Sequence, residues 1–164
     1  KREVTFVTTQ EALNRHPDLD SHARERALAK EYGTVFLMQI GGALSDGKPH
    51  DGRAPDYDDW DLNGDIIFYD NVLDDSVEIS SMGIRVDAES MVKQLKIAGC
   101  EQRLQNRFHK DVVEGNLPLT VGGGIGQSRL CMLILQKAHI GEVQSGLWPD
   151  DMHEKCEKAG INLL

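Results

Sequence analysis

The sequence predicts an α+β domain in which an antiparallel or mixed β-sheet carries helices packed against it. The chain has 164 residues, of which 40% are hydrophobic and 27% charged, a composition that suits a packed domain rather than a disordered chain. Short strand-like runs are joined both by tight turns and by helix-like runs, which disfavours a regular βαβ series. No apolar run approaches the roughly 20 residues of a membrane span, and no signal-like segment precedes the first strand.

The first forty residues predict a strand, two helices and a second strand. Residues 4–7 are strand-like, and Thr8 followed by Glu11 has the spacing of a capping box, which predicts a short helix ending near Pro17. Residues 20–32 predict a second helix that Gly33 closes as a C-terminal cap. Residues 34–40 are apolar and rich in strand formers, so we expect a buried strand there.

The middle of the chain is less regular. Residues 41–65 are dominated by Gly, Asp, Pro and His, and no regular structure is predicted for them. Residues 66–69 and 77–80 predict two strands that pair through a turn at residues 71–75. Residues 88–98 and 101–113 predict two helices separated by Gly99.

The last third is organised around a run of glycines. Residues 117–121 predict a strand that runs into the glycine-rich residues 122–126, followed by a helix at 127–136 and an edge strand at 142–147. The glycine run fails the dinucleotide fingerprint because Arg129 stands where the third glycine belongs. It also fails the P-loop pattern, since Gln-Ser-Arg follows the glycines.

Asp65 and Glu78 are the first candidate site residues. They lie at the edges of the two central strands, so the predicted turn would let both carboxylates face one site. Strand alternation places Glu78 on the same face as Ser80. One or two carboxylates together with substrate phosphates are the usual ligands of Mg²⁺. The alternative is two solvated acids at strand ends.

Three arginines form the second group of candidates. Arg85 follows Gly83, and its forked guanidinium suits a substrate carboxylate, unless it is a surface residue paired with Asp87. Arg129 lies in the first turn of a predicted helix, where the helix dipole disfavours a cation. A bound triphosphate or a stacked adenine would explain it, the alternative being a tight strand–helix connection with a solvent arginine. Arg53 precedes the acidic residues 56–60, which either bind an ammonium group or form a solvated loop; Arg53 itself either pairs with that run or reaches a phosphate.

Charge and cysteine content limit the classes of ligand and the cellular compartment that we expect. The chain has 18 basic and 27 acidic residues, a formal net charge of −9, which argues against nucleic acid as the main ligand. Its 3 cysteines are widely spaced and form neither a disulfide framework nor a zinc pattern. We therefore expect a cytoplasmic protein that binds neither nucleic acid nor a membrane.

Four ordered segments resemble one family: residues 53–60 (RAPDYDDW), 62–65 (LNGD), 78–87 (EISSMGIRVD) and 122–130 (GGGIGQSRL). They are similar to asparagine synthetase A, the ammonia-dependent aspartate–ammonia ligases, and the resemblance runs from about Val4 to Trp148. It implies the antiparallel catalytic fold of class II aminoacyl-tRNA synthetases, a sheet flanked by helices. Residues 1–164 would be the C-terminal half of a single catalytic domain of this kind, in a homodimeric enzyme.

The resemblance also implies chemistry. The family makes asparagine from aspartate, ammonia and ATP through a β-aspartyl-adenylate, releasing AMP and pyrophosphate, with Mg²⁺ at the phosphates. The implied roles are catalysis and ATP binding for Arg53 and Arg129, Mg²⁺ and ATP binding for Asp65 and Glu78, ATP binding for Gly124 and Gly126, and amino-acid binding for Asp58, Ser81 and Arg85.

The chain departs from the family in two ways. Nothing in it matches the family's first half, which supplies the dimer-forming motif and an arginine that contacts the α-phosphate. Between Trp60 and Leu62, where the resemblance implies a longer loop, this chain has only Asp61. We interpret the difference as a mobile stretch that is missing from the sequence; the alternative is a deletion of the loop. The alternative functions are a class IIb aspartyl- or asparaginyl-tRNA synthetase-like core and a non-catalytic paralogue that binds an amino acid or AMP.

Overall fold

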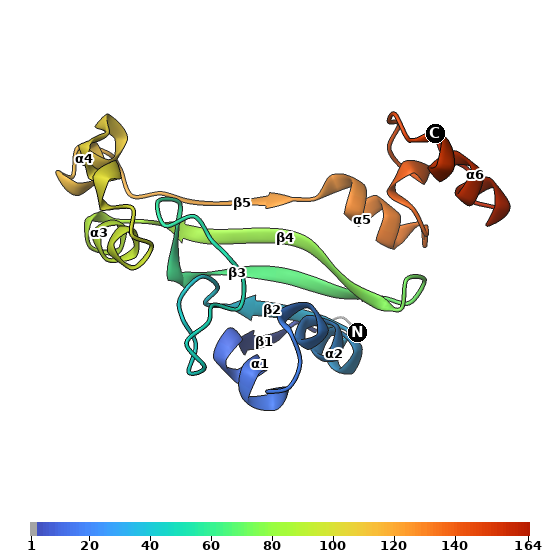
Figure 1. Ribbon diagram of the computed structural model, residues 1–164, viewed down its shortest axis with the longest axis horizontal. Helices are drawn as coiled ribbons and strands as arrows, with labels where there is room; N and C mark the ends of the chain where they lie inside the picture. The colour runs from blue at the N-terminus through green and yellow to red at the C-terminus, as the bar shows by residue number, and fades with distance from the viewer. Residues whose placement is uncertain (1–2) are drawn as a thin grey trace.

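The computed structural model describes residues 3–164 and is built on one mixed five-stranded sheet with the strand order β1-β2-β3-β4-β5 (Figure 1). The strands are β1 (Thr5–Thr8), β2 (Thr34–Met38), β3 (Asp58–Asp70), β4 (Asp75–Arg85) and β5 (Val121–Ile125). β1 pairs in parallel with β2, and every other neighbouring pair is antiparallel. The α+β class and the mixed sheet are confirmed.

Helices gather at both ends of the sheet (Figure 1). They are α1 (Thr9–Arg15), α2 (Ser21–Tyr32), α3 (Ala88–Ile97), α4 (Arg107–Val113), α5 (Gln127–Ile134) and α6 (Asp150–Lys158), with 3₁₀ turns η1 (Glu101–Gln105) and η2 (Ile140–Glu142). α1 lies beside β1 and α2 packs against β2, β3 and β4, whereas α3 and α4 lie at one end of the long β3–β4 hairpin and α5 and α6 lie at the other. Across residues 3–164, no helix has the length and apolarity that a bilayer crossing requires.

The first helices form where local signals place them. Thr8 and Glu11 make the predicted capping box of α1, and Asp20 caps α2 through the backbone N–H of Ala23. Gly33 ends α2 at φ 83°, a conformation that glycine adopts without strain. The main core lies between these elements and the central strands, and its buried members are Val7, Ala12, Leu28, Ala29, Val35, Leu37, Ile40 and Ile67.

The β3–β4 hairpin is much longer than the sequence predicts. β3 begins at Asp58, so residues 58–65 belong to a strand and not to an irregular segment. The Asp, Asn and Gly residues there disfavour strands locally, but Asp58, Asn63, Gly64 and Asp65 pair with β4, and the last two pair with β2 as well. Residues 59–62 have no partner on β4, because the register moves from Asp58↔Arg85 to Asn63↔Gly83. This irregularity includes Asp61.

A bulge in β4 decides which side chains share a face. Ile66 pairs with Ser80 but Ile67 pairs with Glu78, so Ile79 is an additional residue. The bulge places Glu78 on the same face as Ser81. The prediction that Glu78 shares a face with Ser80 is therefore wrong, since simple alternation does not continue through a bulge.

Three further predictions near the C-terminus need correction. The strand predicted at residues 117–121 lies at Val121–Ile125, on the glycines themselves. The helix predicted at 101–113 is divided into η1 and α4, because Asn106 is extended at ψ 148°. Residues 142–147 form no strand; Glu142 instead ends η2, where its carboxylate accepts hydrogen bonds from the N–H groups of Ala138 and His139. α6 was not predicted.

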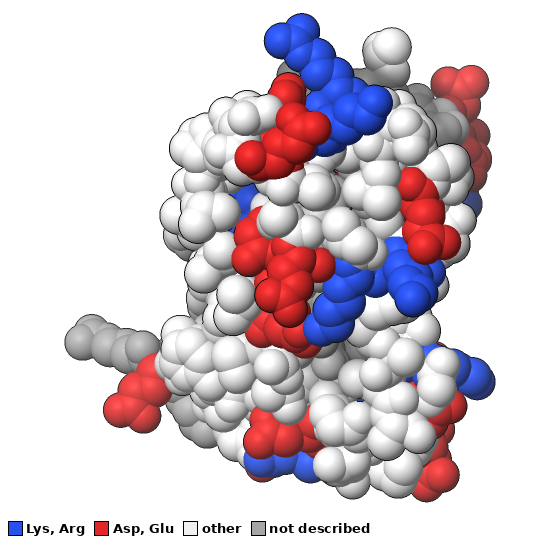
Figure 2. Space-filling model, turned by 90° about the vertical axis from the view of Figure 1, so that its left-hand side faces the viewer, with Lys and Arg blue, Asp and Glu red and all other residues white. Residues whose placement is uncertain are grey.

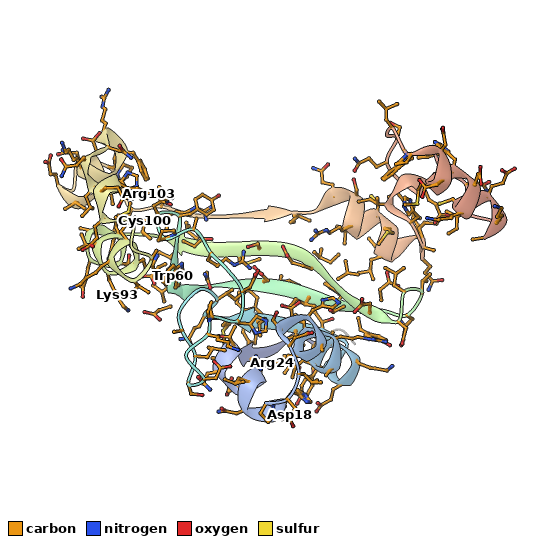
Figure 3. The ribbon with its side chains drawn as sticks, viewed as in Figure 1. Asp18, Arg24, Trp60, Lys93, Cys100 and Arg103 are labelled. Carbon is orange, nitrogen blue, oxygen red and sulfur yellow. The ribbon has the colours of Figure 1, made fainter. Side chains whose placement is uncertain are left out.

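Gln94 of α3 holds the segment that enters β3. Its amide is 2% exposed, accepts from the N–H of Trp60 at 2.8 Å, and donates to the carbonyls of Pro55 at 3.0 Å and Asp58 at 3.1 Å. Trp60 and the neighbouring helix residue Lys93 lie together at this end of the hairpin (Figure 3). The buried amide thus fixes the start of β3, where the candidate site begins.

Candidate active site on one face of β3, β4 and β5

Strand pairing places most of the predicted residues on one face of the sheet. Asp65 pairs with Ser81, Ser81 pairs with Gly124, and Arg85 lies on the same face four residues beyond Ser81. A cavity of about 270 Å³ opens on this face, and its lining includes Asp58, Glu78, Ser81, Arg85, Gly124, Gly126 and Arg129. Arg53 lines an adjoining cavity of about 240 Å³ with Asp58 and Ser81.

Asp65 and Glu78 form the acidic side of the site. Asp65 is 6% exposed, and its Oδ1 has no hydrogen-bond partner. Burial raises the pKa of Asp65 above its ordinary value, against the hydrogen bond from Ser81 and the charge of Arg53. Burial, and then the charge of Asp65, raise the pKa of Glu78. The two carboxylates therefore act on one another, and the alternative of two solvated strand-end acids is wrong for the buried Asp65.

Glu25 and His50 stand beside this pair and were missed by sequence reasoning. The charge of Glu25, on α2, contributes to the raised pKa of both Asp65 and Glu78. His50, whose side chain is 1% exposed, lies with Nε2 2.9 Å from Glu25 Oε1. Neither residue belongs to a motif. The packing of α2 on the hairpin brings Glu25 here, and His50, from the connection between β2 and β3, is placed by its contact with Glu25.

Arg53 joins the acidic side to the rest of the site. Its Nη2 bonds to Asp65, and its Nη1 lies 3.5 Å from Ser81 Oγ. It does not pair with the acidic run at residues 56–60. A guanidinium beside a buried carboxylate makes this corner suitable for a phosphate together with a cation.

Arg85 lies at the other end of the cavity and forms an ion pair with Asp58. Its Cζ is 3.9 Å from the ring centroid of Tyr57, a cation–π contact that sequence reasoning also missed. The alternative pairing with Asp87 is wrong, because the carboxylate of Asp87 caps α3 through Ser90. A juxtaposed carboxylate and guanidinium match the ammonium and carboxylate groups of an amino acid.

Arg129 lies in the first turn of α5, as predicted, and extends toward the acidic pair. Its Nη1 donates to the carbonyl of Glu78 at 2.9 Å and lies 3.7 Å from Glu78 Oε2. Its side chain is 51% exposed, which leaves much of the guanidinium open toward the cavity. A Cβ added to Gly124 would meet nothing within 4 Å, so free space lies above the backbone of β5. Gly124 and Arg129 line the same cavity, so a planar group bound over Gly124 would lie near this guanidinium.

Asp56, the first acid of the run at residues 56–60, has its partners outside the site cavities. Asp56 lies 3.0 Å from His109 Nε2 and accepts from Arg103 Nη1 at 2.9 Å. Burial opposes ionisation of Asp56, yet these two hydrogen bonds hold its pKa below the ordinary value. Asp58 is the acid of the run that lines both site cavities, together with its neighbour Tyr57.

The donor set suits a magnesium ion held jointly with a substrate. Among residues 3–164, no group of three or more His, Cys, Asp or Glu side chains is arranged to hold a metal ion by itself. Asp65 and Glu78 nevertheless provide two close carboxylates of raised pKa, and Asp65 has an unpartnered buried oxygen. Mg²⁺ commonly takes one or two carboxylates and completes its shell with waters and phosphate oxygens.

Charge at the surface is mixed. Figure 2 shows the end of the molecule that carries α3 and α4, where acidic and basic side chains alternate between large uncharged areas. On the described part of this face, no continuous basic surface of the kind that grips a nucleic-acid backbone is visible.

Solved structures define the class of fold. An asparaginyl-tRNA synthetase from Entamoeba histolytica superposes with a TM-score of 0.59 at 19% identity, over 88% of this chain and 35% of that one. An aspartyl-tRNA synthetase from the same organism gives a TM-score of 0.59 at 19% identity, over 87% of this chain and 31% of that one. The chain thus has the fold of the class II aminoacyl-tRNA synthetases.

Sequence comparison then identifies the family. A profile of the family described as aspartate-ammonia ligase matches residues 1–160. The aspartate–ammonia ligase of Levilactobacillus brevis is 63% identical over 161 residues, and that of Clostridium tetani is 59% identical over 162 residues. These matches cover 98% and 99% of this chain and 48% of each relative. The chain belongs to the aspartate–ammonia ligase family and spans about half the length of the curated relatives it matches.

Proposed function

We propose that the chain supplies part of the active site of an ATP-dependent aspartate–ammonia ligase, which makes L-asparagine from L-aspartate and ammonia and releases AMP and pyrophosphate. The observation that carries the proposal is the single cavity that joins the Asp58–Arg85 pair to the Glu78–Arg129 pair. The first pair has the chemistry to hold an amino acid, and the second has the chemistry to hold a nucleotide. An asparaginyl-tRNA synthetase with the same fold has been solved with asparaginyl-adenylate, which supports an adenylate-forming site.

In the proposed reaction, aspartate is held by its α-amino and α-carboxylate groups. The Arg85 fork binds the α-carboxylate, and Asp58 accepts hydrogen bonds from the ammonium group. Ser81, between this pair and Arg53, donates to the substrate. This orientation leaves the β-carboxylate directed toward the acidic side of the cavity, where it attacks the α-phosphorus of ATP. Proximity and orientation supply much of the rate enhancement in such a step.

Arg53 and Arg129 bind the phosphates and oppose the negative charge that accumulates during the attack. Mg²⁺ held by Asp65 and Glu78 would neutralise further phosphate charge when bound. Pyrophosphate leaves and a β-aspartyl-adenylate remains, with its adenine above Gly124 and Gly126. Ammonia then attacks the activated carbonyl carbon, so that AMP departs and asparagine forms.

We further propose that residues 1–164 are the C-terminal half of a single catalytic domain in a cytoplasmic homodimer. The length of the relatives supports a larger catalytic unit, because the chain matches 48% of the Levilactobacillus brevis ligase. The second face of the sheet supports it as well. That face carries the exposed apolar side chains Phe6, Leu62, Ile84, Val121 and Ile125, and a contiguous patch of this kind is normally covered.

The deciding experiment measures AMP formation from ATP and aspartate with and without ammonium. It compares the protein expressed from its complete gene with the 164-residue chain, each checked by intact mass. We expect ammonium-dependent AMP and transfer of labelled nitrogen from ammonium into asparagine by the complete protein, and little turnover by the chain alone. ATP turnover strictly dependent on tRNA would instead indicate a synthetase core, and binding of AMP without Mg²⁺-dependent pyrophosphate release would indicate a non-catalytic paralogue.

A further inference from the structure

We propose that Gly83 and Gly122, paired across β4 and β5, are specificity-determining positions that keep the Asp58–Arg85 ion pair in place for the amino-acid substrate. The inference rests on the proposed function, because it assigns the amino-acid end of the same cavity. Neither glycine contributes a functional group. Their contribution is the space that two missing side chains leave beneath the ion pair.

The geometry of the pair carries the proposal. Gly83 and Gly122 are direct partners in the antiparallel ladder, so their Cβ positions point to the same face of the sheet. A Cβ on Gly122 would lie 2.5 Å from Arg85 Nη2 and 3.2 Å from its Cζ. A Cβ on Gly83 would lie 2.8 Å from Asp58 Cγ and 2.9 Å from its Oδ1. Each glycine therefore lies directly under one member of the ion pair.

Backbone conformation does not explain these glycines. Both lie inside paired strands, and neither has a positive φ, unlike Gly33, Gly41 and Gly99. Gly124, two residues further along β5, would accept a Cβ without any contact within 4 Å. Among Gly83, Gly122 and Gly124, which share this face of the sheet, only the two positions under Asp58 and Arg85 have a side chain this close, which points to the ion pair as the reason for glycine there.

The ion pair is also held from other directions. The Tyr57 ring lies against the guanidinium of Arg85, 3.9 Å from Cζ to the ring centroid. Asp58 is 8% exposed, and its carbonyl is bound by Gln94. A methyl group at Gly122 would therefore push Arg85 away from the sheet and break either the stack on Tyr57 or the bond to Asp58. Displacing a substrate-binding group by about 1 Å typically costs up to ~100-fold in reactivity.

The experiment is a double-mutant cycle in the protein expressed from its complete gene, using Gly122→Ala, Arg85→Ala and the double variant. Aspartate affinity is measured by calorimetry, which needs no turnover, and the KM values for aspartate and ATP are measured separately. We expect Gly122→Ala to weaken aspartate binding by at least ~10-fold while the KM for ATP stays within ~2-fold, because the displacement is confined to the amino-acid end. In the Arg85→Ala background, Gly122→Ala should have no further effect on aspartate affinity.

Gly42→Ala is the matched control, because its Cβ would meet nothing within 4 Å and it lies outside both site cavities. Melting temperatures identify any variant that fails to fold. If Gly122→Ala does, Gly83→Ala replaces it in a cycle with Asp58→Ala, because a Cβ at Gly83 would meet the other member of the ion pair. Unchanged aspartate affinity in Gly122→Ala, equal loss for aspartate and ATP, or additive effects with Arg85→Ala would each overturn the proposal. A parent protein that binds aspartate but makes no asparagine would refute the ligase reaction while the calorimetric cycle still decides the role of Gly122.

Discussion

The buried amide of Gln94 gives a quantitative test of how the amino-acid end of the site is held. Gln94→Met keeps a long, unbranched, helix-compatible side chain but removes three hydrogen bonds, to Trp60 N, Pro55 O and Asp58 O. Because Gln94 is 2% exposed, water cannot replace these bonds without rearrangement. The change therefore leaves three main-chain groups at the start of β3 without partners.

The expected loss can be estimated from these contacts. A buried hydrogen-bonding group left without its partner costs about 1–3 kcal/mol. Three such groups at the lower limit give a loss of about 3 kcal/mol in the free energy of unfolding, since the flexible thioether recovers part of any larger loss by packing. For a domain of this size, each kcal/mol lowers the melting temperature by ~2–4 °C. We therefore expect Gln94→Met to melt ~6–12 °C below the parent.

Thermal unfolding followed by far-ultraviolet circular dichroism measures this shift. Gln102→Met, at an exposed position of η1, is the matched control and should change stability by no more than about 0.5 kcal/mol. In the complete protein, Gln94→Met should also weaken aspartate binding more than ATP binding, because one lost partner is the carbonyl of Asp58. A Gln94→Met chain that melts within ~2 °C of the parent would refute the reasoning that this amide holds the segment.

Three further predictions concern charge, capping and packing. Glu78→Gln removes a carboxylate whose ionisation is opposed by burial and by Asp65. The variant should therefore melt above the parent in metal-free buffer and should lose any rise in melting temperature that Mg²⁺ causes in the parent. A variant that melts below the parent without metal contradicts this. Asp87→Ala removes the N-cap of α3 and should cost about 1 kcal/mol at neutral pH in denaturant unfolding. Because hydrogen bonding lowers the pKa of Asp87, its contribution is present above the ordinary carboxyl pKa and lost as the pH falls through the folded-state value; a cost that stays constant in acid refutes this. Gly64→Ala places a Cβ 2.6 Å from Phe36 Cζ and should lower the free energy of unfolding, measured with denaturant, by about 1–3 kcal/mol. A Gly64→Ala variant as stable as Gly42→Ala contradicts this prediction.

Local signals in the sequence are sufficient to predict the first strand and the first two helices. The capping box of Thr8 and Glu11, the cap at Asp20 and the glycine end of α2 each involve residues within a few positions of one another. Interactions of this range are encoded in the sequence itself, so the helix limits followed closely. The turn between the central strands was found for the same reason.

Strand limits were less accurate where composition and tertiary pairing disagree. Asp58, Asn63 and Gly64 favour irregular structure by themselves, yet they lie in a strand because each pairs with β4, and Gly64 pairs with β2 as well. Gly122 to Gly124 likewise belong to β5 because β4 offers a pairing partner. The absence of a Cβ allows this close pairing, since a Cβ at Gly123 would come within 2.7 Å of Met82 Cβ. No propensity scale contains this information.

The candidate site was likewise predictable from the sequence only in part. The sequence alone determined which chemical groups are present, since the motifs around Asp58, Asp65, Glu78, Arg85 and Arg129 identified the acids and arginines that line or adjoin the cavity. Their partners were decided only by the tertiary structure. The bulge at Ile79 turned Glu78 toward the site, α2 brought Glu25 beside the acidic pair, and Tyr57 and two glycines placed Arg85. Each of these depends on contacts between residues far apart in the chain, and such contacts exist only once the sheet has formed.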